Sequence, residues 1–311
     1  MEIVNWKIDD DLKKEMANHY QAKRSFEAKN IHPADIINEY TFSFGVKNFN
    51  SNSPLRLFKL VERIIGIEIY GVGVEVGSGP GTHTALLAKM NKVKKVYGVE
   101  ASEGIVRNLA PVVVSYVAGK DDKKVSCVVG DFSNLELPDN SVDFVFDFFS
   151  LHHTSDLQSV IKEIYRVIKP GGFLFCFDKA RDNALSNADL EKLLDTEYSP
   201  EFKKKMGVPE DIKHTRRMNG ENEYRRKEWF KYIESAGFKK AEHFNLARTA
   251  SRNKLLLIIK NIYSLIPPRI QAVISNVLPI KPTNNISANN RIYSGLLNNY
   301  HKEISLIIGY K

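Results

Sequence analysis

A glycine-rich turn between an apolar strand and a helix is the sequence feature that most constrains the fold. Residues 74–82 read Val-Glu-Val-Gly-Ser-Gly-Pro-Gly-Thr, and a helical pattern over 84–90 follows them. Glycine lets the backbone turn tightly and approach a bound ligand, because it carries no Cβ. The N–H groups at the start of the helix then face that ligand. The run therefore predicts a ligand-binding strand–loop–helix unit.

The spacing of the glycines separates two classes of ligand site. In a dinucleotide-binding fingerprint the third glycine comes five residues after the first. Here Thr82 holds that position, Gly81 comes one residue early, and Glu75 lies two residues before Gly77. This E-x-G-x-G-x-G pattern resembles motif I of the class I S-adenosylmethionine-dependent methyltransferases. A nicotinamide oxidoreductase and a noncatalytic relative remain as alternatives.

The resemblance continues through about 110 residues, from Gly71 to about Lys179. Apolar runs at 95–100, 125–129, 143–149 and 173–177 look like the next four strands, and the Arg-Val-Ile-Lys-Pro-Gly-Gly run at 166–172 is frequent in the family. Glu100 follows Gly77 by 23 residues, near the spacing at which an acid meets a ribose in doubly wound folds. The order of these motifs is more specific than any one of them.

The resemblance implies an α/β fold with a doubly wound, mostly parallel, seven-stranded Rossmann-like sheet and S-adenosyl-L-methionine as cofactor. It implies that Glu75 braces the glycine loop, that Glu100 accepts hydrogen bonds from the ribose, and that Asp131 faces the adenine amino group. Asp147 either holds the amino group of the cofactor or is a buried structural acid. The predicted cofactor-binding residues are Glu75, Gly77, Ser78, Gly79, Gly81, Glu100, Ala101, Asp131, Phe132 and Asp147.

Three side chains are candidates for catalysis. His152 and His153 follow the fourth strand and Asp178 ends the fifth, so all three belong to the carboxyl edge of the sheet, where ligands bind in such folds. A histidine there can act as a general base near neutral pH. The structural alternative is that one histidine packs or caps the next helix. No metal-site spacing is present.

The rest of the chain adds to this core. We expect a helical cap at 1–66, the cofactor-binding core at 67–180, a lid or substrate segment at 181–225, and the remainder of the core at 226–246 and 303–311. The intervening insertion, 247–302, falls within residues 243–302, which hold eight basic side chains and no acid. Its apolar runs are too short to span a bilayer. They either lie in an anionic membrane interface or pack on the core or in a homodimer.

Composition narrows the function further. The polar start shows no signal peptide, and the two cysteines fall in separate strands, so we expect a cytoplasmic protein, with peripheral attachment at the inner membrane face if the insertion binds lipid. The large lid segments favour O-methylation of a sugar-containing or lipid-linked small molecule. Nucleic acid or another small metabolite is the alternative acceptor, although no basic stripe interleaved with aromatic residues is evident for nucleic acid. A noncatalytic scaffold is disfavoured by the intact glycines, Glu100 and Asp131.

Overall fold

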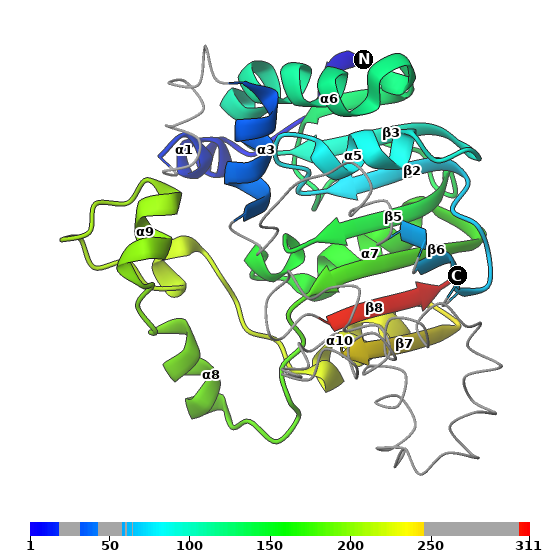
Figure 1. The fold of residues 1–311 in the computed structure, drawn as a ribbon. Coiled ribbons are helices and arrows are strands. Elements are labelled where there is room, and N and C mark those ends of the chain that lie inside the picture. The colour runs from blue at the N-terminus through cyan, green and yellow to red at the C-terminus, as the bar shows by residue number, and fades with distance from the viewer. Residues whose placement is uncertain (19–31, 43–57, 60, 64, 246–304) are drawn as a thin grey trace, which may run out of the picture.

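The structure is a computed structural model that describes residues 1–18, 32–42, 58–59, 61–63, 65–245 and 305–311. Within them an eight-stranded sheet runs through the molecule in the order β1-β4-β3-β2-β5-β6-β8-β7 (Figure 1). All neighbouring strands are parallel except β8, which is antiparallel to both β6 and β7. The predicted doubly wound, mostly parallel α/β fold is confirmed.

The strands match the apolar runs of the sequence closely. Their bounds are β1 Glu2–Asn5, β2 Gly71–Val76, β3 Val93–Glu100, β4 Val125–Val129, β5 Val142–Phe148, β6 Ile168–Asp178, β7 Lys240–Asn245 and β8 Ser305–Tyr310. The central strands are buried on both faces, which is why they read as nearly continuous apolar runs rather than as alternating ones.

The eighth strand, β1, was not expected, because the sequence predicts a helical cap at the N-terminus. Its four residues pair in parallel with β4, with Glu2 opposite Ser126, and the Trp6 N–H continues the ladder to Val129 O at 2.8 Å. Glu2 also accepts hydrogen bonds from the Ser126 hydroxyl at 2.6 Å and from Lys95 at 2.9 Å. A strand this short and this exposed has no apolar pattern to reveal it, and long-range pairing alone defines it.

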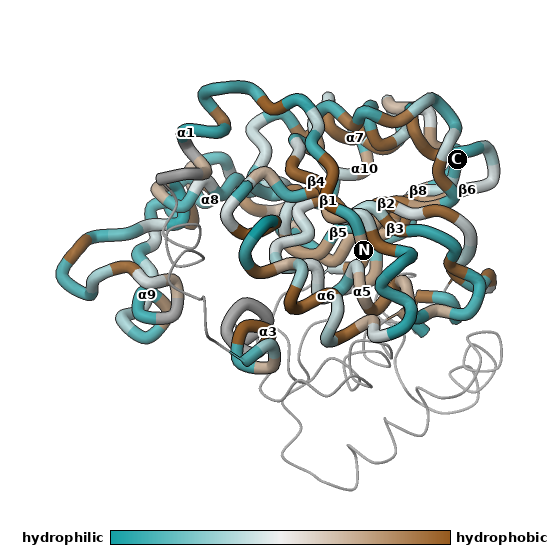
Figure 2. Tube along the Cα trace, turned by 90° about the horizontal axis from the view of Figure 1, so that it is seen from above, coloured by the Kyte–Doolittle hydropathy of each residue, from teal (hydrophilic) through white to brown (hydrophobic). Residues whose placement is uncertain are grey.

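Helices cover both faces of the sheet, as Figure 2 shows from above. Helices α3 (Pro33–Phe42), α5 (Thr82–Ala88) and α6 (Ala110–Ala118) lie on one face, and α7 (Leu157–Val167) and α10 (Arg226–Ala236) on the other. Helix α10 ends at Gly237, whose φ of +107° is the left-handed conformation that commonly stops a helix. Three further α-helices are α1 (Asp10–Asn18), α8 (Asn187–Leu194) and α9 (Pro200–Met206). Short helical turns are a π-helix, η1 (Ile105–Leu109), and the 3-10 helices η2 (Gly119–Lys124), η3 (Leu151–His153) and η4 (Arg217–Asn219).

Strand periodicity sorts the side chains of β5 and β6 between the two cores. Phe144, Phe146 and Phe148 of β5 lie with the apolar cluster on the α5 side, whereas Val145 joins the cluster on the α7 side. Because successive side chains point to opposite faces, Asp147 and Asp178 both fall on the α7 side, at the carboxyl ends of neighbouring strands. This places two acids at the edge where the glycine loop also lies.

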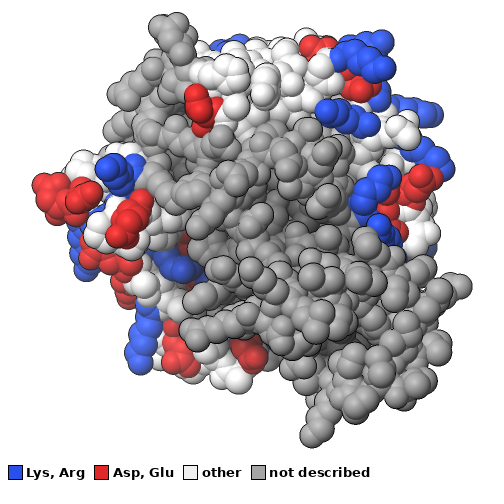
Figure 3. All heavy atoms as spheres, in the orientation of Figure 1, with Lys and Arg blue, Asp and Glu red and all other residues white. Residues whose placement is uncertain are grey.

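The predicted insertion, 247–302, lies outside the described residues, as do residues 43–57. None of the described helices is long and apolar enough to cross a membrane. On the face seen in Figure 3, the acidic and basic side chains of the described residues are interspersed.

Candidate functional site

The three glycines of the loop differ in the space around them: two lie against other side chains and one does not. Gly77, Gly79 and Gly81 have φ values of +65°, +52° and +79°, a region that disfavours residues with a Cβ. A Cβ at Gly77 would overlap the Ser150 side chain, and one at Gly81 would press on Val114. At Gly79 it would meet no atom of the described residues within 4 Å. A ligand therefore has room to approach the backbone at Gly79.

Glu75 supports the loop from inside the protein. The side chain is buried, the Thr84 hydroxyl donates a hydrogen bond to its Oε2, and His83 Nδ1 lies 3.6 Å from its Oε1. Both partners belong to the start of helix α5, so the carboxylate ties strand β2 to the helix across the loop. This geometry supports the bracing role that the resemblance implies.

Glu100 ends strand β3 beside the same loop. Its Oε2 accepts the Gly79 N–H at 3.1 Å, and its Oε1 accepts the Ser102 N–H at 2.8 Å. Burial raises the pKa of Glu100, and the N–H groups of Ser102, Gly79 and Ala101 oppose that rise. Each carboxylate oxygen keeps further acceptor capacity, so the pair of oxygens suits a ribose diol.

Asp131 and Phe132 follow strand β4 next to Glu100, since the Gly130 N–H donates to Glu100 O at 3.1 Å. The Asp131 carboxylate accepts the Ser133 N–H at 2.8 Å and the Ser133 hydroxyl. Both Asp131 and Phe132 remain half-buried. By the resemblance, the adenine of the cofactor lies beside these two residues. Their contacts with the adenine stay predictions.

Asp147 lies under the turn that follows strand β5. Its Oδ1 accepts the N–H groups of Ser150 and Leu151, both at 3.0 Å, and its side chain is fully buried. The turn passes through Phe149, whose φ of +59° is unusual for a bulky residue. Strain of this kind concentrates at functional sites. These contacts favour the structural alternative for the Asp147 side chain.

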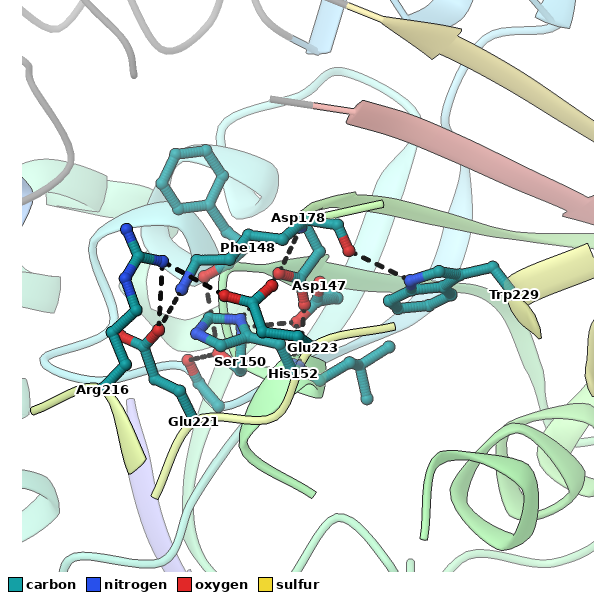
Figure 4. A network of polar contacts seen from close by, with 12 residues as sticks. Asp147, Phe148, Ser150, His152, Asp178, Arg216, Glu221, Glu223 and Trp229 are labelled. Atoms are coloured by element: carbon teal, nitrogen blue, oxygen red, sulfur yellow. Dashed lines mark hydrogen bonds and ion pairs between the residues drawn. The ribbon is translucent and has the colours of Figure 1, made fainter. Parts of the chain in front are cut away.

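His152 is held by Asp178 through two hydrogen bonds (Figure 4). Its backbone N–H donates to Asp178 Oδ2 at 3.0 Å, and its ring Nδ1 lies 2.7 Å from Asp178 Oδ1. An ionised Asp178 makes Nδ1 the protonated nitrogen and leaves Nε2 as the basic one. No described residue is hydrogen-bonded to Nε2. Two of the three predicted catalytic side chains thus form one pair.

His153 differs from its neighbour. Solvent reaches its ring, which lies 4.3 Å from the His152 ring between centroids. The surrounding protein nevertheless reduces its hydration, and this effect, with the neighbouring His152 ring and the Lys179 ammonium, lowers the pKa of His153 to about 3. A base that stays neutral at all ordinary pH values accepts a proton poorly, so His152 is the better candidate.

An ion-pair network that the sequence did not reveal holds the 181–225 segment over the end of strand β6 (Figure 4). Lys179 Nζ lies 2.5 Å from Glu221 Oε2, and the Tyr198 hydroxyl donates to Glu221 Oε1. Arg216 Nη1 bridges Glu221 at 3.6 Å and Glu223 at 3.2 Å. Burial opposes the ionised form of Glu221, but the Lys179 ammonium and the neighbouring His152 outweigh it and lower the pKa of Glu221 to about 2. We call this set the lid network.

Several basic side chains of the 181–225 segment have carboxylate partners. Arg217 lies 2.6 Å from Glu191 and 2.9 Å from Asp195, and Lys203 lies 2.9 Å from Glu197. No local pattern distinguishes these acids from solvated ones, because their partners are distant in the sequence.

Comparison with known proteins gives the family of the core. Residues 74–176 match the family described as Methyltransferase domain. Demethylmenaquinone methyltransferase of Geobacillus stearothermophilus is 31% identical over 128 residues, which are 41% of this chain and 53% of the relative. The enzyme of the same name from Listeria monocytogenes serotype 4a is 38% identical over 88 residues, 28% of this chain and 35% of the relative. The chain thus spans about half the length, or less, of these curated relatives.

Solved structures share the fold. Phosphoethanolamine N-methyltransferase 2 of Haemonchus contortus, in complex with phosphomonomethylethanolamine and S-adenosylhomocysteine, has a TM-score of 0.51 and 20% identity, over 93% of this chain and 60% of that one. The [4+2]-cyclase SpnF has a TM-score of 0.51 and 15% identity, over 94% and 96%. At these identities the likeness concerns the fold alone.

The loop and its neighbours fit the cofactor of this family. The open face at Gly79 admits a ligand to the backbone, and the Glu100 carboxylate beside it offers two oxygens to a diol. The chain therefore carries a methyltransferase domain of the class I, S-adenosylmethionine-dependent type, with S-adenosylmethionine as its cofactor.

Proposed function

We propose that this protein transfers the methyl group of S-adenosylmethionine to a hydroxyl of a small lipid-linked acceptor, with His152 as the general base. The observation that carries the proposal is the Asp178–His152 pair at the carboxyl edge of the sheet. His152 follows Ser150 by two residues, and the Ser150 hydroxyl donates to Gly77 O in the glycine loop at 3.0 Å. The base and the cofactor loop are thereby parts of one rigid unit.

The chemistry needs few protein groups. The bound cofactor supplies a methyl group on a sulfonium, which is displaced in line by the acceptor atom. The protein has to hold the acceptor in that line and keep water out. A hydroxyl acceptor must also lose a proton, and a base oriented by a carboxylate serves that step. His152 Nε2 receives the proton, and Asp178 stabilises the imidazolium that forms.

Two observations favour a lipid-linked acceptor over a water-soluble one. The sequence relatives are named as enzymes that act on demethylmenaquinone, a quinone with a lipid tail. The acid-free segment at 243–302 combines eight positive charges with apolar runs, a composition that suits an anionic membrane interface. A sugar-containing lipid is the second form of acceptor that these features accommodate.

The experiment is a transfer assay with isotopically labelled S-adenosylmethionine and mass spectrometry of the products. The acceptors are a quinol with a short isoprenoid tail, a lipid-linked sugar, the tail-free form of each, and RNA. We expect label in a tailed acceptor, less in its tail-free form and none in RNA. The Glu100→Ala variant is the control for cofactor-dependent transfer. Label only in RNA or only in tail-free molecules would overturn the proposed substrate class.

The same assay tests a second candidate function, in which the protein binds the cofactor but transfers no methyl group. The fold admits it, because the structural neighbours include a protein described as a [4+2]-cyclase. Cofactor binding by calorimetry with no labelled product from any acceptor would favour that reading.

A further inference from the structure

Two buried carboxyl groups lie together behind His152. In the parallel pairing of β5 with β6, Asp147 is opposite Cys176, so Asp178 is its diagonal neighbour on the same face. Both side chains have no exposed surface. Figure 4 shows Asp147 next to Asp178 and His152, so the two carboxyl groups are neighbours in the buried space behind the histidine.

The donors around the pair are unevenly distributed. Asp178 Oδ1 accepts from the His152 ring and from the Lys179 N–H at 2.6 Å, and Asp178 Oδ2 accepts from the His152 N–H. Asp147 Oδ1 accepts two N–H groups, but Asp147 Oδ2 has no donor among the described residues. A buried anionic oxygen without a donor is costly. Two adjacent buried anions are costlier still.

A metal ion or a lysine ammonium could also offset the second negative charge. The described residues contain no group of three or more His, Cys, Asp or Glu side chains arranged to hold a metal ion. The nearest ammonium, that of Lys179, is paired with Glu221. A proton on Asp147 Oδ2 removes one charge and supplies the missing contact in a single step, because Asp178 Oδ2 has a free lone pair to accept it.

We propose that Asp147 is a carboxylic acid at neutral pH and donates a hydrogen bond from Oδ2 to the Asp178 carboxylate, which makes it a positioning residue for His152. The proposal rests on the proposed function, in which His152 is the base. Asp147 keeps Asp178 in the orientation that holds the His152 ring, without adding a second negative charge. In the same turn it holds the Ser150 and Leu151 N–H groups, and so fixes the backbone just before His152.

The electrostatics of the site agree with this arrangement. Burial, and then the charge of Asp178, raise the pKa of Asp147 well above its usual value. Burial also disfavours the ionised Asp178, but His152, the Lys179 N–H and the Lys179 ammonium outweigh it and lower the pKa of Asp178. The other titratable groups facing His152 are His153 and Glu221. The proton therefore belongs to Asp147 rather than to Asp178.

The direct test is infrared difference spectroscopy of the full-length protein with cofactor. We expect a carbonyl stretch of a protonated carboxylic acid at neutral pH that disappears in Asp147→Asn. The matched control is Asp143→Asn, which removes an acid of the same strand that pairs with Lys169 at 2.9 Å and should leave the band in place. A spectrum without such a band, or a band that persists in Asp147→Asn, would overturn the proposal.

A second experiment measures how Asp147 affects His152, the proposed base, through kcat, KM and the pH profile. Asp147→Ala removes the donor and should lower kcat with little change in KM for the acceptor. Asp147→Asn, which keeps a donor toward Asp178 and an acceptor for the two N–H groups, should restore most of that loss and keep the pH profile of the native protein. A profile displaced to lower pH in Asp147→Asn would mean that a negative charge had been removed, and would contradict a protonated Asp147.

The two proposals fail in different ways. If the protein transfers no methyl group but the infrared band is present and specific to Asp147, the proposed function fails and the protonated pair stands. If transfer occurs and depends on His152 while the band is absent, the pair is wrong and the function stands.

Discussion

The Ser150 hydroxyl donates a hydrogen bond to Gly77 O at 3.0 Å and occupies the space in which a Gly77 side chain would lie. The turn after strand β5 and the cofactor loop after strand β2 are therefore fitted to each other. A change in either one is transmitted to the other.

Gly77→Ala should weaken both folding and cofactor binding. The φ of +65° costs about 1–2 kcal/mol for a residue with a Cβ, and the overlap with Ser150 adds to it. Adding Ser150→Gly relieves the overlap but not the backbone strain, so the double variant should recover only part of the loss in urea denaturation. Gly66→Ala gives the cost of the backbone alone, since Gly66 has φ +73° and no atom of the described residues lies within 4 Å of a Cβ placed there. Equal losses of stability for Gly77→Ala and Gly66→Ala would contradict the close packing of Ser150 against Gly77.

Glu100→Ala should reduce the affinity for S-adenosylmethionine by about 1–3 kcal/mol, the size expected for lost hydrogen bonds to a charged group. Because burial raises the pKa of Glu100, affinity should also fall as the pH drops through that raised value and the carboxylate loses an acceptor. Calorimetry measures both effects. Glu103→Ala, at an exposed acid paired with Arg107, is the control. Unchanged affinity in a folded Glu100→Ala protein would refute the ribose assignment.

Breaking the lid network should destabilise the protein far more than breaking a surface pair. Glu221→Ala leaves the largely buried Lys179 without its partner, which costs about 3–5 kcal/mol for pairs of this kind. Arg217→Ala removes two exposed pairs and should cost less than about 1 kcal/mol. Thermal denaturation compares the two, and limited proteolysis within 195–220 reports on release of the segment. Similar losses in both variants would show that the network contributes little.

The same network makes stability depend on pH in a defined window. The pKa of Glu221 is lowered to about 2, whereas a Glu in an unfolded chain titrates at about 4.3. A lowered pKa stabilises the fold above the unfolded value, and that contribution is lost as the pH falls from about 4.3 toward about 2. Denaturation curves between pH 2 and 7 should show this loss in the native protein and not in Glu221→Gln.

His152→Gln should bind cofactor normally but turn over about 10²–10⁴-fold more slowly once an acceptor is identified. His153→Gln should turn over at close to the native rate, because a pKa of about 3 leaves His153 neutral throughout the assay range. If both variants turn over at the native rate, the acceptor needs no histidine base.

The acid-free segment predicts binding to anionic vesicles. Basic residues near such a surface contribute about 1 kcal/mol each, and the apolar runs add to this by leaving water. Flotation at low salt should carry the protein with the vesicles, and high salt should release part of it because the charge interaction is screened. Deletion of residues 255–280 should abolish flotation while leaving cofactor binding intact. Protein that stays in the dense fraction at low salt would instead support packing on the core or in a dimer.

Local sequence patterns are enough to predict the cofactor loop and the strands of the core. Strands β2 to β5 lie within a few residues of the predicted runs and β6 contains the run 173–177, because hydrophobic period, β-branched content and glycine position act through neighbours in the chain. The positive φ values of Gly77, Gly79 and Gly81 follow from the same local pattern. It also brought His152 and Asp178 to one edge, since the carboxyl ends of parallel strands share that edge.

Which of these side chains act together depends on the tertiary structure. The placement of Asp147 beside Asp178 depends on the register of two strands, because a displacement of one residue would send one acid to the other face. The pairing of Lys179 with Glu221 joins residues 42 positions apart, and β1 pairs with a strand more than 120 residues away. Contacts of this range carry no periodic signal, because they are set by packing of the whole sheet.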